Sequence, residues 1–266
     1  MTMRDFDGAT AVVTGAAGGL GHALCERFGR AGSRIVALDR DCAGLERLAS
    51  TLRARRIEVA TFACDVTDEE ACRRAMRAAV DAFGGIDLLV CNAGLSHHGE
   101  FSRTVPDVIR RVMAVNFFGA VHCTHAALPE LLARRGMIVA ISSVAGFAPL
   151  LGRTGYAASK HALHGFFDSL RCELEGERVK VMLACPSFID TGIDRNALDG
   201  EGRPWRGEKA ITGVLASPAE VADAIHEAAR REHRLLLPGA TARLAWWTSR
   251  LAPAAYARIM MKRMRR

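Results

Sequence analysis

Short apolar segments alternate with amphipathic segments along almost the whole chain, and this alternation constrains the fold more than any other feature. The apolar segments are rich in β-branched residues, as buried strands are, and cover residues 11–14, 34–38, 58–64, 86–91, 137–142, 180–185 and 235–237. Segments with helical periodicity lie between them, at residues 20–31, 43–55, 68–83, 106–133, 156–174 and 218–231. Such strands, alternating with helices, are typical of a parallel sheet with helices on both faces. We therefore expect an α/β fold with a doubly wound, seven-stranded parallel sheet.

A glycine-rich turn follows the first expected strand. In the stretch TGAAGGLGHAL, Gly15, Gly19 and Gly21 let the backbone turn tightly and approach a pyrophosphate, which the free amide groups of the next helix would bind. The spacing is GxxxGxG rather than GxGxxG, and a glycine turn without a ligand is the competing interpretation. The position of the turn between a strand and a helix favours dinucleotide binding.

The end of the second expected strand bears on the choice of cofactor. Asp39 in ALDRD can accept hydrogen bonds from both hydroxyls of the adenosine ribose and would repel a 2′-phosphate, which favours NAD. Arg40 could instead pair with a 2′-phosphate, so NADP remains the alternative, and a solvated charge pair with Asp41 is the interpretation without a ligand.

Several ordered motifs resemble those of the short-chain dehydrogenase/reductases, over the range from Gly8 to Leu237. They are TGAAGGLG, CDVTD with Asp65, CNAG at residues 91–94, VNFFG with Asn116, and the pair ISSVAG with Ser143 and YAASK with Tyr156 and Lys160; the stretch PSFIDT is similar to the segment beside the nicotinamide. The resemblance implies a single-domain Rossmann fold and hydride transfer between a nicotinamide and a secondary alcohol or ketone. We expect the following residues around the cofactor: Gly15, Gly19, Leu20, Gly21, Asp39, Arg40, Asp65, Val66, Asn92, Ala93, Gly94, Tyr156, Lys160, Pro186, Ile189 and Thr191.

The resemblance also implies four catalytic residues, Asn116, Ser143, Tyr156 and Lys160. Tyr156 and Lys160 are four residues apart and lie on one face of a helix. A free tyrosine titrates near 10, and a neighbouring ammonium favours the phenolate, so the pair suits proton exchange with a substrate oxygen. The small residues between the two keep bulk away from the cofactor.

The resemblance also gives roles to the other two catalytic residues. Ser143 would hydrogen-bond the substrate oxygen, and its spacing of 13 residues to Tyr156 distinguishes it from Ser142. Asn116 would hold a water that links Lys160 to solvent, and Thr191 would bond the cofactor carboxamide or cap a short helix. Two positions depart from the family pattern: Cys91 replaces an asparagine and Ser187 replaces a glycine.

The substrate is expected to contact the segment 193–215, whose one large aromatic is Trp205. Few charges lie near Phe147, Leu150, Leu151 and Phe188, which suggests a lipophilic substrate with a steroid-like, fatty or terpenoid skeleton. His97 and His98 follow the CNAG turn and are candidates for the mouth of the site. The pairs His122 with His125 and His161 with His164 lack accompanying carboxylates or cysteines, so we expect no metal site.

Residues 1–238 are expected to form one catalytic domain, and residues 239–266 a basic extension with one or two helices interrupted at Pro253. Two interpretations of the extension stay open: docking over the cleft or against a partner subunit, and peripheral contact with an anionic membrane. Docking is favoured because the charge pattern is not cleanly one-sided.

The charge and cysteine patterns limit the location and partners. Segment 233–266 carries eight basic and no acidic residues, and since the whole chain carries +7 the rest carries −1, which argues against nucleic-acid binding. Eight scattered cysteines without a CxxC pair suggest reduced thiols and a cytoplasmic location, and no signal peptide or membrane-spanning run is visible.

The rival functions are a catalytically silent dinucleotide-sensing regulator, which would normally lack Tyr156 or Lys160, and an epimerase or dehydratase, which would need a longer chain. By resemblance we also expect a homodimer or homotetramer, built from the helices that begin near Pro106 and Tyr156.

Overall fold

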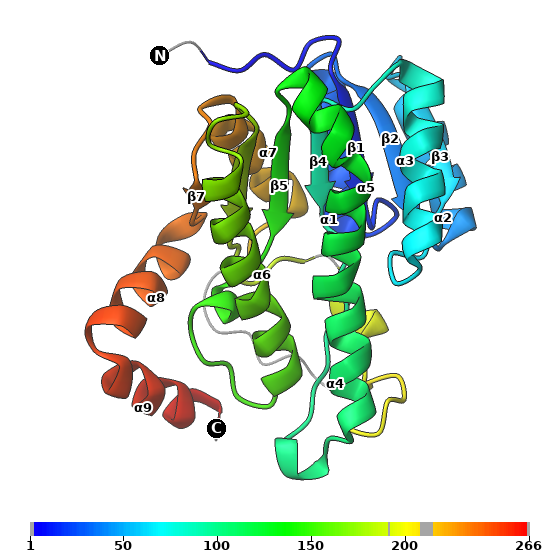
Figure 1. Cartoon of the computed structure of the whole chain (residues 1–266). Helices are drawn as coiled ribbons and strands as arrows, with labels where there is room; N and C mark the ends of the chain where they lie inside the picture. The colour runs from blue at the N-terminus through cyan, green and yellow to red at the C-terminus, as the bar shows by residue number, and fades with distance from the viewer. Residues whose placement is uncertain (1–2, 191, 208–214, 265–266) are drawn as a thin grey trace.

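The computed structural model describes residues 3–190, 192–207 and 215–264, and its centre is a parallel sheet (Figure 1). Seven strands of the described residues lie in the order β3-β2-β1-β4-β5-β6-β7, and every neighbouring pair is parallel. Their bounds are β1 Thr10–Thr14, β2 Arg34–Asp39, β3 Val59–Ala63, β4 Leu88–Cys91, β5 Met137–Ile141, β6 Lys180–Ala184 and β7 Leu235–Leu236. The expected doubly wound, seven-stranded α/β fold is confirmed, although β4 begins two residues later than the sequence suggested.

Helices cover both faces of the sheet, because alternate strand residues point to opposite sides. Ala11 and Val13 belong to a core cluster with α1, α2 and α7, whereas Val12 between them belongs to a second cluster with α3, α5 and α6. The helices are α1 Gly19–Arg30, α2 Cys42–Ala54, α3 Glu69–Phe83, α4 Pro106–Met113, α5 Gly119–Arg134, α6 Thr154–Glu173, α7 Pro218–Arg230, α8 Gly239–Leu251 and α9 Pro253–Met264. The strands are therefore buried on both sides, which explains their continuous apolar sequence.

The strand order reverses direction at β1, which pairs with β2 on one side and with β4 on the other. Crossover connections leave the sheet on opposite faces at this point, so a crevice forms outside the carboxyl ends of β1 and β4. The glycine-rich turn after β1 and the CNAG turn after β4 both lie at this edge. The topology alone thus brings two of the sequence motifs together.

The expected single helix over 106–133 is wrong in one detail. A π-helical turn, Ala114–Phe118, separates α4 from α5 and contains Asn116. The wider turn holds one residue more than an α-helical turn, and such turns occur often at functional sites. Hydrophobic periodicity could not predict it, because the residues on either side continue in helical conformation.

Two helices follow β7 and pack beside the open end of the sheet (Figure 1). α8 ends at Leu251, two residues before Pro253, whose ring lacks the amide hydrogen that a continuous helix would use. Trp246 of α8 packs edge to face on Phe147 with ring centroids 4.8 Å apart, and Ala245 and Tyr256 join Ala148 in a small apolar cluster. None of the helices in the described ranges is long and apolar enough to cross a bilayer.

All eight cysteines are free, and six of them are buried. Cys91, which replaces the family asparagine, is 6% exposed, and burial raises the pKa of its thiol to about 12. The side chain therefore packs as a small apolar group at the end of β4.

Candidate active site

A cavity of about 470 Å³ lies at the carboxyl ends of the central strands. The cavity is lined by residues of the glycine turn, the ends of β2, β4, β5 and β6, the first turns of α6, and the helices α8 and α9. The following expected site residues line it: Gly15, Gly19, Leu20, Gly21, Asp39, Arg40, Asp65, Val66, Asn92, Ala93, Gly94, Ser143, Tyr156, Lys160, Pro186 and Ile189. Asn116 lies behind the wall, and Thr191 falls outside the described residues.

The glycine turn has the geometry of a phosphate cradle. Gly15 has φ +64°, and a Cβ there would lie only 2.8 Å from Ala93 Cα. A Cβ on Gly21 would collide with the carbonyl oxygen of Gly15, so α1 can begin this close to the turn only with glycine. Gly18, the residue before α1, makes no side-chain cap, and the helix therefore presents its first amide groups to the cavity. These residues fit a dinucleotide pyrophosphate.

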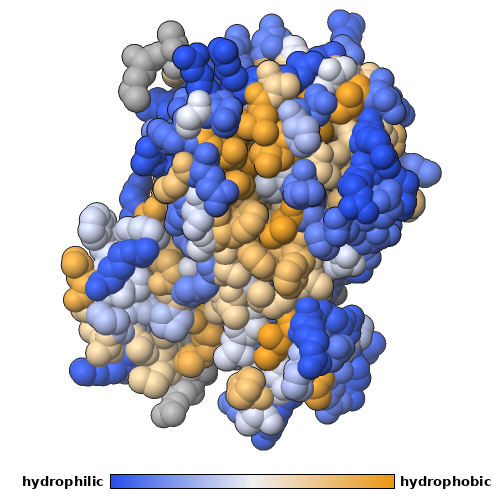
Figure 2. All heavy atoms as spheres, viewed as in Figure 1, coloured by the Kyte–Doolittle hydropathy of each residue, from blue (hydrophilic) through white to orange (hydrophobic). Residues whose placement is uncertain are grey.

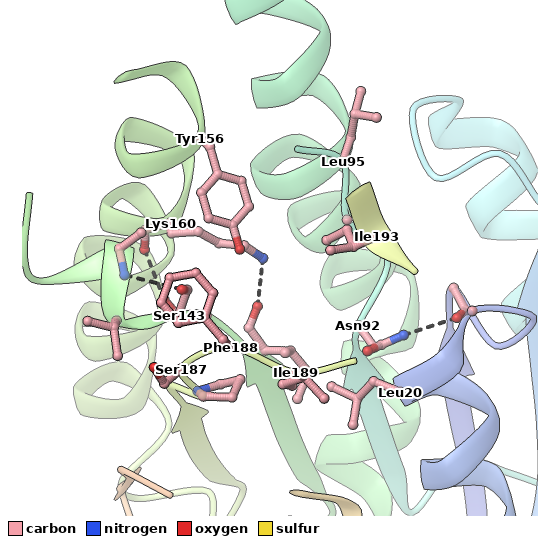
Figure 3. A pocket seen from close by; sticks show the side chains of 18 of the residues that line it. Leu20, Asn92, Leu95, Ser143, Tyr156, Lys160, Ser187, Phe188, Ile189 and Ile193 are labelled. Carbon is pink, nitrogen blue, oxygen red and sulfur yellow. Dashed lines mark hydrogen bonds between the residues drawn. The ribbon is translucent and has the colours of Figure 1, made fainter. Parts of the chain in front are cut away.

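A hydrogen-bonded latch joins the ends of β1 and β4. The Thr14 hydroxyl accepts the amide hydrogens of Asn92 and Ala93, both at 3.0 Å. Asn92 Nδ2 donates to the carbonyls of Thr14 and Gly15 at 2.9 and 3.0 Å, and Figure 3 shows the Asn92 side chain bonded to the glycine turn. The latch holds the glycine turn against the CNAG turn. We did not predict from the sequence that Thr14 would make these hydrogen bonds. The available signal was a threonine at the end of a buried apolar strand.

Two backbone amides orient the Asp39 side chain. Its two carboxylate oxygens accept the amide hydrogens of Ala17 and Asp41, each at 3.0 Å, and the side chain is half-buried at the cavity wall. Each carboxylate oxygen can accept further bonds, which leaves room for ribose hydroxyls. Arg40 is exposed at the edge of the same cavity.

Tyr156 and Lys160 lie in the first two turns of α6 and both reach the cavity (Figure 3). The Lys160 Nζ lies 5.8 Å from the centre of the Tyr156 ring and donates a 2.8 Å hydrogen bond to the carbonyl of Ile141. Burial lowers the pKa of the Lys160 ammonium from its ordinary 10.5 to about 8. Gly155 permits this placement of α6, since a Cβ there would lie 3.1 Å from Ile109 of α4.

The two serines after β5 have different surroundings. The Ser142 hydroxyl is buried and donates to the carbonyl of Lys160 at 3.2 Å, which fixes the end of β5 to α6. The Ser143 Oγ accepts the amide hydrogen of Ala145 at 3.2 Å and lies in the cavity on the same side as Tyr156 (Figure 3). Both serines line the cavity, but Ser142 donates its hydroxyl hydrogen to Lys160, whereas Ser143 accepts one and can still donate to a bound substrate.

Asn116 uses its whole amide to hold the loop after β4. Its Nδ2 donates to the carbonyl of Leu95 and to the Ser159 hydroxyl, both at 2.9 Å, and its Oδ1 accepts the amide hydrogen of Leu95 at 2.7 Å. The side chain is 1% exposed. These contacts make Asn116 a positioning residue for the wall beside Lys160, and its expected water-holding part stays a prediction.

A model of the short chain dehydrogenases matches residues 9–202 of this chain. The chain belongs to the short-chain dehydrogenase family. A dehydrogenase/reductase SDR family protein 7-like from Anopheles gambiae is 39% identical over 267 residues, covering 98% of this chain and 84% of that protein. Dehydrogenase/reductase SDR family member 7B from Bos taurus is 36% identical over 266 residues, covering 97% and 82%.

A solved short-chain dehydrogenase/reductase from Burkholderia phymatum, in complex with NAD, has the same fold. It is 30% identical to this chain with a TM-score of 0.81, and the match covers 94% of this chain and 96% of that one. As a member of this family, the chain is an oxidoreductase that uses a nicotinamide dinucleotide.

The part of the cavity that α8 and α9 reach is lined mainly by apolar residues, and the charged Arg153 also lines the cavity. Leu95, Pro149, Leu150 and Phe188 line it, and α8 and α9 add further apolar residues. Phe147 and Leu151, which we expected there, do not line it: Phe147 packs on Trp246 of α8, and Leu151 is 38% exposed.

The histidines after β4 are not part of the cavity wall. His97 is fully buried, and His98 stacks on Trp205 with ring centroids 3.7 Å apart. The amide of His98 donates to the carbonyl of Leu198 at 2.8 Å, so the loop and the segment around residue 198 form one unit. Residues 208–214 of the expected lid lie outside the described residues, and among those described no group of metal-binding side chains occurs.

Proposed function

We propose that this enzyme transfers a hydride between NAD and a secondary alcohol or ketone with a lipophilic skeleton. The observation that carries the proposal is the convergence of Ser143, Tyr156 and Lys160 on one cavity that also contains the glycine turn. The apolar substrate end supports the lipophilic class. A carboxylate such as Asp39, oriented by two backbone amides, supports NAD over NADP.

The residues of the chain would handle the proton while the nicotinamide supplies or accepts the hydride. Ser143 hydrogen-bonds the substrate oxygen and aligns it with Tyr156, whose hydroxyl gives a proton to the oxygen during reduction and takes one during oxidation. The Lys160 ammonium stabilises the phenolate that forms. Because burial lowers the pKa of Lys160 to about 8, this positive charge is present in the cofactor-free enzyme below that pH and is lost above it.

Cofactor choice can be tested at Asp39. The variant Asp39→Ser is expected to lower kcat/KM for NAD by about tenfold to a hundredfold, because charged hydrogen bonds to the ribose are lost, and to raise kcat/KM for NADP. Steady-state kinetics with both cofactors would measure the shift. Arg40→Ala is the matched control at the neighbouring position: a large loss with NADP and none with NAD would show that Arg40 binds a 2′-phosphate. An unchanged NAD preference in Asp39→Ser would contradict the assignment.

The reaction itself can be tested by the absorbance of reduced nicotinamide during incubation with a panel of alcohols and ketones. We expect turnover of long-chain or polycyclic ketones and little turnover of sugar-like or small charged alcohols. A preference for the polar compounds would refute the lipophilic class. Tight NADH binding without turnover of any compound would favour the silent regulator.

We also propose a cytoplasmic homodimer or homotetramer. Phe118, between α4 and α5, is 49% exposed, and the surface over α5 and α6 is largely apolar (Figure 2). Light scattering on a size-exclusion column would give the number of subunits, and a strictly monomeric protein would contradict this proposal.

A further inference from the structure

The outer face of α8 and α9 is apolar although it is exposed. Leu244, Trp247 and Leu251 share one side of α8, at positions i, i+3 and i+7, and their exposed fractions are 66%, 60% and 77%. On α9, Ile259 and Met261 lie on either side of the inward-packed Met260 and are 50% and 42% exposed. We refer to these five residues as the outer face. Large apolar side chains clustered on a surface indicate an interaction site.

The two helices are held to the body of the protein by their other side. Ala245 and Tyr256 are each 8% exposed and pack with Ala148, next to Phe147 and Met260. The inner side thus supplies the docking that the sequence suggested. The five residues of the outer face are not part of this apolar cluster.

The charges that α8 and α9 themselves carry are all positive. Arg243, Arg258 and Lys262 are exposed on the same two helices, and segment 233–266 contains no acidic residue. In Figure 2, orange and blue residues lie side by side over α8 and α9. Basic side chains next to tryptophan and aliphatic residues are the combination that binds anionic lipid headgroups and the acyl region below them. A second copy of this chain would meet the same face with charges of the same sign, which disfavours association.

The outer face also borders the opening of the cavity. Leu244 and Ile259 line the cavity and are nevertheless 66% and 50% exposed, so they lie where the cavity meets the surface. Thr241, Thr248 and Met260 continue the wall inward from the same helices. A molecule leaving a bilayer beneath the outer face would therefore meet the apolar end of the cavity first.

We propose that the outer face of α8 and α9 binds an anionic lipid surface, and that the lipophilic substrate reaches the cavity from that surface. The second half of this proposal rests on the proposed function, whereas the first half does not. The substrate class that follows is a membrane-dissolved alcohol or ketone.

Vesicle flotation tests the first half. The probes are vesicles of phosphatidylcholine with and without phosphatidylglycerol, and the proteins are the full chain, the double variant Trp247→Glu/Leu251→Glu, and Phe101→Glu. Trp247 and Leu251 do not line the cavity, and Phe101, which is 67% exposed outside α8 and α9, provides a control of equal exposure. We expect the full chain and Phe101→Glu to bind the anionic vesicles, and the double variant to bind them at least about tenfold more weakly.

Either of two results would overturn the first half: no flotation of the full chain, or equal flotation of the double variant. If light scattering then showed that the double variant had lost subunits, the outer face would be an interface between copies instead.

Kinetics test the second half. With a ketone dissolved in anionic vesicles, kcat/KM of the double variant should fall about tenfold, while with a water-soluble ketone it should stay within about twofold of the unmodified enzyme. Equal loss with both ketones, or with neither, would refute access from the membrane. Vesicle binding without reduction of any ketone would refute the proposed function and leave the lipid-binding face standing.

Discussion

Replacing Tyr156 with phenylalanine is expected to lower kcat about a thousandfold, since general acid–base catalysis typically contributes 10²–10⁴. The ring is 9% exposed and packs with Val112 and Ala145, and phenylalanine keeps these contacts. The loss should therefore appear in turnover, with NADH affinity and thermal stability close to those of the unmodified enzyme. Stopped-flow or steady-state absorbance would measure turnover, and fluorescence titration would measure NADH binding.

The chain offers a matched control, because it contains only two tyrosines and both line the cavity. Tyr256 belongs to α9 and packs with Ala148 and Ala245. We expect Tyr256→Phe to lower kcat by less than about threefold. If Tyr156→Phe retained more than a tenth of the turnover, Tyr156 could not be the proton donor.

Replacing Lys160 with methionine is expected to abolish most turnover and at the same time to stabilise the cofactor-free protein. The lowered pKa, about 8 instead of 10.5, means that the folded protein holds the protonated lysine less well than the unfolded chain does, by about 3 kcal/mol. Methionine removes this cost but leaves the Ile141 carbonyl without its 2.8 Å donor, which costs about 1 kcal/mol. The free energy of unfolding at pH 7 should therefore rise by about 2 kcal/mol.

The difference in free energy of unfolding between the two proteins should change with pH in a definite direction. Below pH 8 Lys160 is protonated in both the folded and the unfolded protein, so the full cost is present. Between pH 8 and 10.5 the folded protein loses the proton first, and the stability of the unmodified enzyme rises relative to the variant. Urea unfolding at pH 7 and pH 10 would measure the difference. A variant that is less stable at pH 7, or a difference independent of pH, would contradict a buried, desolvated Lys160.

The order of strands and helices was predictable because burial on both faces imposes a continuous apolar sequence on each strand. Val12 and Val13 illustrate this, since they point into different core clusters and both need to be apolar. The cavity edge was predictable from the same pattern, because parallel strands place the turns that follow them at one end of the sheet. Helix geometry predicted that Tyr156 and Lys160 share one face of a helix, whereas their catalytic roles came from the family resemblance.

Other parts of the site depended on contacts between distant segments. The π-turn at Asn116 became visible only with its hydrogen bonds to Leu95 and Ser159 in place. The latch at Thr14 involves residues 78 and 79 positions further along the chain. The place of Phe147 under Trp246, rather than in the cavity, likewise required the position of α8.

A crystal structure of the enzyme with NAD tests the central claim most directly. The account predicts the dinucleotide in the cavity, with its pyrophosphate on the glycine turn and the Tyr156 hydroxyl and Lys160 ammonium both facing the nicotinamide riboside. A bound cofactor with the Tyr156 hydroxyl directed away from the nicotinamide, or with Lys160 out of reach of both, would contradict it.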